Sequence, residues 1–198
     1  MWNYRTPGVP DELFMTAEEV PGPTKEEIRV LTVSKARVKE GFRVTDVGCG
    51  TGSITVEIAL QVGPSGRVFA IDENEEAVKV TRENVKRFNV QDRVEVILGR
   101  APEVMRDLPT MDAIIVGGSS FLKKVLKTSK EKLKEGGRIV INAITLDTAY
   151  EALRELEGLG FREMDVVMVF VAKGRFVEGR VMMMARNPVT IISATKFG

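Results

Sequence analysis

The chain has 198 residues, of which 43% are hydrophobic and 29% are charged, and its formal net charge is +1. These values are typical of one globular domain with a substantial core, and they exclude a strong overall attraction to nucleic acid or to an anionic membrane. The chain has one cysteine, Cys49, and no histidine, which excludes an intrachain disulfide, a Cys-rich zinc site and any nucleophile that a histidine activates.

The first residues predict neither a signal peptide nor a membrane anchor. Arg5, Pro7 and Pro10 interrupt them, and no apolar run in the chain is long enough to span a bilayer. We therefore expect a cytoplasmic protein without a membrane partner. Residues 1–23 are rich in proline and lack a sustained period, which predicts an irregular arm on the domain or a poorly ordered terminus. Residues 24–198 are expected to form a single domain.

The remaining elements alternate between strand and helix before the pattern changes in the tail. A first helix is expected over 24–38, with Thr24 and Glu27 forming a capping box. Strands are expected over 43–47, 67–71, 94–98, 111–116 and 138–144, and helices over 53–62, 75–88, 102–108, 121–133 and 146–156. Gly136 and Gly137 are expected to close the helix before them. In the tail, strands without intervening helices are expected over 161–171, 181–185 and 189–193, with breaks at Gly174, Gly179 and Pro188.

This order of elements predicts an α/β fold. Parallel strand–helix units with right-handed crossovers give a doubly wound, Rossmann-like sheet with helices on both faces. The tail adds a C-terminal antiparallel β piece. In such sheets ligands bind beyond the carboxyl ends of the strands, so the loops at that edge are the first place to look for a site.

The most informative of these loops is the stretch Asp46-Val-Gly-Cys-Gly-Thr-Gly52, between a β-branched strand and an amphipathic helix. Its three glycines allow a sharp turn and a close approach to a ligand, and the helix behind them offers N–H groups and a positive dipole end. A dinucleotide fingerprint is G-x-G-x-x-G, but Ser53 stands where its third glycine would be. The carboxylate of Asp46 favours a cationic ligand over a pyrophosphate.

The same stretch resembles motif I of the class I S-adenosylmethionine-dependent methyltransferases, acid-x-G-x-G-x-G. In that family the glycines line the methionine end of the cofactor, which carries an ammonium and a sulfonium. The resemblance implies S-adenosyl-L-methionine as the cofactor. It implies cofactor-binding roles for Asp46, Gly48, Cys49, Gly50, Thr51 and Gly52, although Cys49 is assigned no chemistry.

Three further loops follow the next predicted strands. Asp72 ends the second strand, where an acid can accept the hydrogen bonds of a ribose diol; its alternative role is the N-cap of a helix from Glu73. Gly99-Arg100-Ala101 follows the third strand and makes a small-residue turn where an adenine could lie. The roomy loop Gly117-Gly118-Ser119-Ser120 follows the fourth strand and faces the expected place of a methyl acceptor, although Ser119 or Ser120 could also cap the next helix.

Several stretches together resemble one narrower family. They are Gly8–Phe14, Val20–Ile28, Asp46–Gly52, Gly117–Ser119 and Arg186–Pro188. They are similar to the cobalt-precorrin C15-methyltransferases of cobalamin biosynthesis, the decarboxylating enzymes of the anaerobic pathway, over nearly the whole chain. Motif I is shared by very many methyltransferases. The combination of Pro-Gly-Pro-Thr, Gly-Gly-Ser and Arg-Asn-Pro in one chain is much more specific.

The resemblance implies methylation of a cobalt-bound precorrin at C15, loss of CO2 from its C12 acetate side chain, and a homotetramer. It adds cofactor contacts at Thr24, Asp72 and Ala101. One departure is Arg100, which stands where many family members have an aspartate that contacts the adenine amino group. Because arginine cannot accept a hydrogen bond, either the backbone of Ala101 supplies this contact or adenine binds more weakly.

A tetrapyrrole acceptor is a polycarboxylate, so cationic donors are expected around its pocket. The candidates are Lys123, Lys124, Arg175, Arg180 and Arg186, and a solvated basic face is the simpler explanation for the two lysines. The predicted substrate-binding residues are Gly117, Gly118, Ser119, Arg175 and Arg186. No catalytic residue and no metal site is assigned, because a sulfonium methyl is electrophilic without help from the protein. Met182-Met-Met184 fits a core or subunit-interface strand better than a pocket wall.

Other functions stay open at this point. A class I methyltransferase with another acceptor, such as tRNA, protein or a small molecule, has the same cofactor motif, although the balanced charge argues against nucleic acid. A dinucleotide-dependent oxidoreductase conflicts with Asp46 and with the missing third glycine. A non-catalytic cofactor-binding subunit would keep Gly48, Gly50, Gly52 and Asp72.

Overall fold

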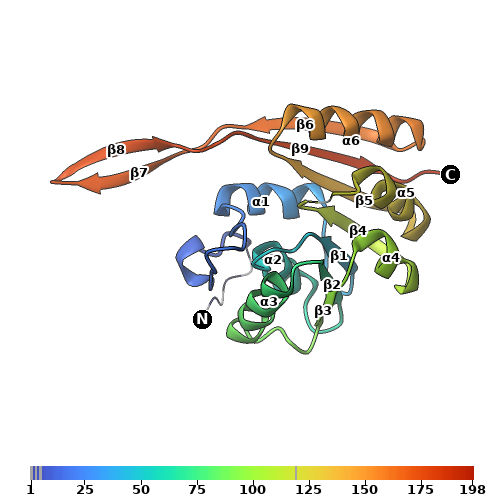
Figure 1. Cartoon of the computed structure of the whole chain (residues 1–198), viewed down its shortest axis with the longest axis horizontal. Coiled ribbons are helices and arrows are strands. Elements are labelled where there is room, and N and C mark those ends of the chain that lie inside the picture. Colours follow the sequence, from blue (N-terminus) through green and yellow to red (C-terminus); the bar gives the residue numbers. More distant parts are fainter. Residues whose placement is uncertain (1, 3, 5, 119) are drawn as a thin grey trace.

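A central sheet organises the molecule, a computed structural model that describes residues 2, 4, 6–118 and 120–198. Within these residues the sheet has seven strands in the order β3-β2-β1-β4-β5-β9-β6 (Figure 1). Their bounds are β1 Arg43–Val47, β2 Arg67–Asp72, β3 Val94–Leu98, β4 Met111–Val116, β5 Leu133–Ala143, β6 Arg162–Val169 and β9 Val189–Thr195. Strands β1 to β5 are parallel, whereas β9 is antiparallel to both β5 and β6. The predicted doubly wound α/β sheet with an antiparallel end is confirmed.

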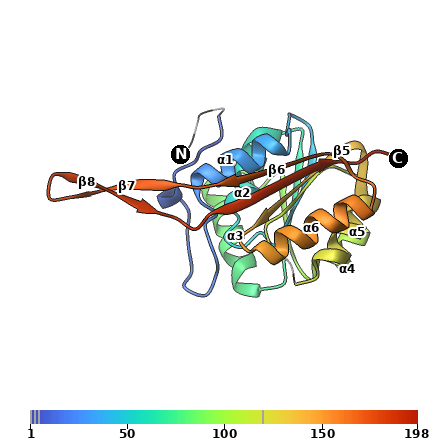
Figure 2. The same ribbon diagram turned by 90° about the horizontal axis from the view of Figure 1, so that it is seen from above.

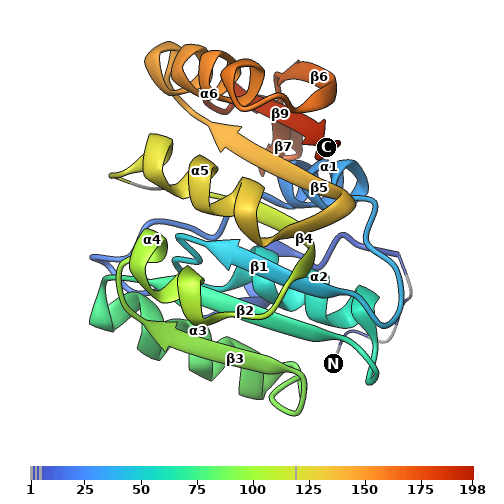
Figure 3. The same cartoon turned by 90° about the vertical axis from the view of Figure 1, so that its right-hand side faces the viewer.

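Helices cover both faces of this sheet. Their bounds are α1 Glu26–Lys35, α2 Ser53–Val62, α3 Glu75–Arg87, α4 Ala101–Val104, α5 Leu122–Lys132 and α6 Leu146–Gly158, with 3-10 turns η1 Asp11–Leu13 and η2 Met105–Asp107. Helices α1, α2 and α3 pack on one face, and α5 and α6 pack on the other (Figures 2 and 3). None of the helices in the described part of the chain is long and apolar enough to cross a membrane.

Strand β4 shows why the strands read as continuous apolar runs. Ala113 and Ile115 contribute to the core beneath α1–α3, while Ile114 and Val116 contribute to the core beneath α5 and α6. A parallel strand that is buried on both faces favours apolar side chains on each of them. The same alternation applies along β1, where Val44 and Val47 belong to different cores.

The N-terminal arm lies on the side of α1, α2 and α3. Val9 and Phe14 are buried in the core beneath these helices, and the Glu57 carboxylate on α2 accepts hydrogen bonds from the backbone N–H groups of Gly8 and Val9. The arm also caps helix α1 at its N-terminus, because Asp11 Oδ1 accepts a hydrogen bond from the Glu26 backbone N at 2.9 Å.

The predicted capping box at Thr24 and Glu27 is therefore wrong. Helix α1 begins at Glu26, its N-cap is Lys25, and no side chain of that residue caps it. The cap comes instead from Asp11, fifteen residues before Glu26 in the chain. A local sequence signature cannot reveal a cap that a distant segment supplies.

The tail contains a hairpin that the sequence did not predict in full. Between β6 and β9 the chain forms β7, Ala172–Val177, and β8, Arg180–Ala185, which pair with each other and extend away from the body (Figures 1 and 2). Gly174, predicted as a break, lies inside β7. The turn is made by Glu178 and Gly179, which both have positive φ, as a tight hairpin turn requires.

Gly136 and Gly137, which were expected to close the preceding helix, lie elsewhere. Helix α5 ends at Lys132, and both glycines lie inside β5, which begins at Leu133. The two elements follow each other without a loop, and Gly136 takes a φ of +74° within the strand.

Candidate cofactor and substrate cleft

One large cavity of about 1020 Å³ lies at the carboxyl ends of strands β1 to β5. At one end it is lined by the loops after β1, β2 and β3, and at the other by the loop after β4, by the end of β5 and by the tail. The lining includes Pro21–Lys25, Gly48–Thr51, Asp72–Asn74, Gly99–Ala101, Gly117, Gly118, Phe121, Asn142, Val171, Arg186, Asn187 and Val189. Loops far apart in the sequence thus form one site, as expected for an open α/β sheet.

The glycine turn after β1 is held by close contacts to three different segments. Gly48, Gly50 and Gly52 all have positive φ, of 71°, 56° and 74°. A Cβ at Gly48 would lie 2.3 Å from the backbone oxygen of Gly118, and one at Gly52 would lie 2.8 Å from Thr81 on α3. The glycines thus permit close packing of protein segments around the turn. Gly48 and Gly50 line the cavity, while Gly52 faces α3.

Asp72 lies at the centre of the predicted cofactor end. Its Oδ2 accepts a hydrogen bond from the Gly50 backbone N at 2.9 Å, and its Oδ1 accepts one from the Asn74 backbone N at 3.0 Å. The helix N-cap is Asn74, so the alternative capping role of Asp72 is wrong. Each carboxylate oxygen keeps acceptor capacity, and Asp72 lines the cavity.

Asp46 is buried beneath the glycine turn and does not line the cavity. Thr55 Oγ1 donates to its Oδ2 at 2.6 Å, and its Oδ1 has no partner among the described residues. Burial raises the pKa of this carboxyl to about 6, although the hydrogen bond from Thr55 opposes the shift. A nearby positive charge would stabilise the ionised form of this buried carboxylate, because only one of its oxygens has a hydrogen-bond partner in the described part of the chain.

Cys49 and Thr51 complete the turn. Burial raises the pKa of the Cys49 thiol, and the negative charge of Asp46 adds to this shift, so the side chain is an unreactive thiol at neutral pH. Its Sγ lies 3.5 Å from Thr81 Oγ1. The Thr51 hydroxyl is buried without a hydrogen-bond partner among the described residues, and both residues line the cavity.

The loop after β3 places Arg100 across the end of the cavity. Its guanidinium carbon lies 4.8 Å from the centre of the Phe121 ring, and its Nε lies 3.4 Å from Glu73 Oε2. Ala101 begins α4 and also lines the cavity. Arg100 thus points toward an aromatic ring and a carboxylate, and only the backbone of this turn offers acceptors at the place of the family aspartate.

At the other end the cavity is lined by Gly117 and Gly118, while Ser119 lies outside the described residues. Asn142, near the end of β5, was missed by the sequence analysis. Its Oδ1 lies 3.1 Å from Thr32 Oγ1, and its Nδ2 has no partner among the described residues. The available signal was a polar residue at the carboxyl end of an otherwise apolar strand.

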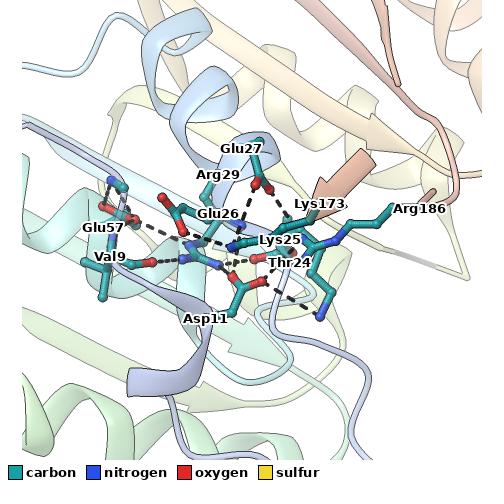
Figure 4. Close-up of polar contacts among 11 residues, drawn as sticks. Val9, Asp11, Thr24, Lys25, Glu26, Glu27, Arg29, Glu57, Lys173 and Arg186 are labelled. Atoms are coloured by element: carbon teal, nitrogen blue, oxygen red, sulfur yellow. Dashed lines mark hydrogen bonds and ion pairs between the residues drawn. The ribbon is translucent and has the colours of Figure 1, made fainter. Parts of the chain in front are cut away.

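The predicted cationic residues divide into two groups. Arg186 lines the cavity, and its Nη1 lies 3.4 Å from Asp11 Oδ2 and 3.3 Å from Glu27 Oε2 (Figure 4). Arg175 lies on β7, in the projecting hairpin, and does not line the cavity. Lys123 instead pairs with Glu155 at 2.9 Å on the outer surface of α5 and α6.

Comparison with known proteins decides the family. Residues 18–196 match the precorrin methyltransferase domain. The chain belongs to this family. It is 47% identical over 197 residues to a probable cobalt-precorrin-6B C(15)-methyltransferase (decarboxylating) of Saccharolobus solfataricus, covering 98% of both chains.

Two solved structures of family relatives agree with this fold over nearly the full length. The precorrin-8W decarboxylase of Methanobacterium thermoautotrophicum is 40% identical with a TM-score of 0.89, covering 94% of this chain and 98% of that one. The precorrin-6y C5,15-methyltransferase of Geobacter metallireducens is 36% identical with a TM-score of 0.90, covering 98% and 100%. As a precorrin methyltransferase, the chain is an enzyme.

The precorrin methyltransferase cleft has no group of acidic or cysteine side chains suited to a metal ion among the residues described. It offers a carboxylate at Asp72, a buried negative charge at Asp46 and a guanidinium at Arg186. These groups can bind and orient polar ligands. The chain has no histidine, so a proton transfer by imidazole is excluded.

Proposed function

We propose that this precorrin methyltransferase transfers a methyl group from S-adenosyl-L-methionine to C15 of a cobalt-precorrin, with loss of CO2 from the C12 acetate of the same acceptor. The observation that carries the proposal is that one cavity has a glycine turn and Asp72 at one end and Arg186 at the other. This arrangement suits a cofactor and a carboxylated acceptor bound side by side. The acceptor is the one in the names of the relatives, cobalt-precorrin-6B.

The residues at the glycine turn fit the cofactor. A ribose diol has two donors, and Asp72 is an acceptor at the cavity wall. The unpartnered Oδ1 of Asp46 lies beneath the turn, where a cationic methionine group would favour its ionised form. We assign cofactor binding to Thr24, Gly48–Gly52, Asp72, Ala101 and Asp46. Of these, Gly52 and Asp46 do not line the cavity and would act by supporting the turn.

When bound, S-adenosyl-L-methionine supplies a methyl group on an electrophilic sulfonium. The chain supplies binding and orientation, which can account for a large part of a rate enhancement. Gly117, Gly118 and Asn142 border the place where the acceptor carbon would lie, and Arg186 would hold an acceptor carboxylate. We place Ser119 in the same loop by its position in the sequence.

The projecting hairpin supports assembly into a homo-oligomer, for which the family resemblance implies a tetramer. In its register Gly174 pairs with Met183 and Phe176 pairs with Val181, so one face carries only apolar residues and glycine. Phe176 is 81% exposed and Met183 is 61% exposed in the single chain. An isolated hairpin is marginally stable in water, so a second copy is proposed to cover this face. We assign the enzyme to the cytoplasm.

Binding of S-adenosylhomocysteine and of NAD tests the cofactor. Calorimetry on the wild type is expected to give micromolar binding of S-adenosylhomocysteine and no binding of NAD. Asp72→Ala should weaken the former by about 10- to 100-fold, the loss typical of hydrogen bonds to a charged group.

The matched control is Asp107→Ala, which removes an exposed carboxylate outside the cavity and should leave the affinity unchanged. Binding of NAD in place of S-adenosylhomocysteine would overturn the methyltransferase proposal in favour of an oxidoreductase. Binding of neither ligand would contradict both.

A further inference from the structure

Asp11 of the N-terminal arm joins two guanidinium groups that serve different parts of the cleft. Its Oδ1 accepts hydrogen bonds from the Glu26 backbone N at 2.9 Å and from Arg29 Nη1 at 2.7 Å. Its Oδ2 lies 3.4 Å from Arg186 Nη1 (Figure 4). The Asp11 side chain is 15% exposed, so these contacts are only partly screened by water.

Arg29 holds the wall of the cofactor end. Its side chain is fully buried, with Nε 3.4 Å from Glu57 Oε1. Its Nη1 also donates to the Thr24 carbonyl, and its Nη2 donates to the Val9 carbonyl. A buried guanidinium requires such partners, and Thr24 lines the cavity. Arg29 therefore fixes the arm and the segment before α1 in one arrangement.

Arg186 is held differently. Its Nη1 is shared by Asp11 and by Glu27 Oε2, which lies 3.3 Å away. Within the part of the chain that the structure describes, its Nε–H and its Nη2–H groups donate no hydrogen bond to a side chain or to the backbone. A guanidinium anchored through one nitrogen still offers donors that match a carboxylate. Arg186 lines the acceptor end of the cavity, where such a carboxylate would arrive.

We propose that Asp11 is a positioning residue that, together with Glu27, holds the Arg186 guanidinium at the acceptor end of the cleft to receive a carboxylate of the tetrapyrrole. This inference rests on the proposed function, because it takes a polycarboxylated acceptor. A free arginine side chain loses much conformational entropy when it binds a ligand. Contacts that restrain it beforehand reduce this loss and so favour binding. Because Asp11 also contacts Arg29, one carboxylate links the guanidinium at the acceptor end to the guanidinium that holds the cofactor end.

A double-mutant cycle separates this role from a purely structural one. The probe is uroporphyrin, a stable tetrapyrrole with carboxylates on every ring, titrated by its fluorescence into the protein saturated with S-adenosylhomocysteine. Arg186→Ala should weaken uroporphyrin binding by about 10- to 100-fold, as expected for loss of a charge-assisted pair. Asp11→Asn should weaken binding in the wild-type background, but should cause no further loss in the Arg186→Ala background.

Two single variants serve as matched tests on α1. Glu27→Gln removes the other carboxylate at Arg186 without touching Arg29, and should also weaken uroporphyrin binding. Glu26→Gln makes the same change one residue earlier, where the carboxylate lies 3.5 Å from Lys173 and does not contact Arg186. It should leave binding unchanged. Affinity for S-adenosylhomocysteine, measured on every variant, checks that the cleft is intact.

The possible results distinguish the inference from the proposed function. If Asp11→Asn leaves uroporphyrin binding unchanged, or weakens the Arg186→Ala variant as much as the wild type, Asp11 does not act through Arg186 and the inference is overturned. If Arg186→Ala binds uroporphyrin like the wild type, the inference alone fails. A wild-type protein that binds S-adenosylhomocysteine but no uroporphyrin would contradict the acceptor class and the inference together.

Discussion

At the scale of single residues, the three glycines of the turn have different neighbours. Gly48 faces the backbone of Gly118, Gly50 faces the Pro21 carbonyl, and Gly52 faces Thr81. Sequence analysis predicted the sharp turn correctly because positive φ favours glycine. It could not show which segments approach each glycine, because the β4 loop, the arm and α3 come together only in the folded chain.

Gly48→Ala should be strongly destabilising. Its φ of +71° alone costs an alanine about 1–2 kcal/mol, and the new Cβ would lie 2.3 Å from the Gly118 backbone oxygen. Gly136→Ala is a matched control, because Gly136 has a φ of +74° and a Cβ added there would meet no atom within 4 Å. Urea unfolding should give a clearly larger loss for Gly48→Ala. Equal losses would show that the close packing against Gly118 is unimportant.

The buried Asp46 should make stability depend on pH. Its pKa is about 6 in the folded chain against an ordinary value of 3.8, so the folded chain binds this proton more tightly and loses stability as pH rises between these values. Asp46→Asn should therefore be more stable than the wild type by about 3 kcal/mol above pH 6, from 1.36 kcal/mol per pKa unit. The gain should fall toward zero near pH 4.

Urea unfolding of both proteins at several pH values checks this difference. The asparagine Oδ1 can still accept the hydrogen bond that Thr55 donates, so the neutral variant keeps that contact. A difference between the two proteins that does not change with pH would contradict the raised pKa.

At the scale of elements, the sequence predicted best where the hydrophobic pattern of a segment is distinct and its ends are marked locally. The predicted bounds of β1, α2, β3 and β4 agree with the structure. Each of these elements has an apolar pattern bounded by polar or turn residues. The predictions failed where a distant segment sets the end of an element, as at the N-terminus of α1. They also failed where an element is exposed and therefore has no alternation of buried and exposed residues. The exposed strand β7 belongs to this second kind, whereas β8, expected over 181–185, lies at Arg180–Ala185.

The apolar face of the hairpin should be required for assembly. Phe176 and Met183 lie on this face, so a double change to glutamate, Phe176→Glu with Met183→Glu, would place charges in the proposed interface. Light scattering should show a larger mass for the wild type than for the variant, with unchanged S-adenosylhomocysteine affinity.

Arg180→Ala is the control for the hairpin experiment, because Arg180 pairs with Val177 and points to the opposite face. Its mass should equal that of the wild type. A wild-type protein that is monomeric at micromolar concentration would contradict the proposed assembly, and the exposed face would then need another explanation.

At the scale of the whole molecule, the cleft joins the two ends of the chain. The arm supplies Asp11, the loop after β1 supplies the glycine turn, and the tail supplies Arg186. The sequence placed most predicted site residues around this one cavity. Among the described residues the exceptions are Arg175, on the hairpin, and Asp46 and Gly52, which do not line the cavity. Asn142 was missed because a single polar residue in an apolar strand carries no distinctive spacing.

The most direct measurement of the central claim is a product analysis with cobalt-precorrin-6B and S-adenosylmethionine labelled at its methyl carbon. The purified protein should give a product that has gained one labelled methyl at C15 and lost one CO2, and the two changes should appear in equal amounts. Mass spectrometry and carbon NMR would detect both. No turnover, or a methyl at another position with the acetate intact, would contradict the assignment of this chain as a decarboxylating C15-methyltransferase.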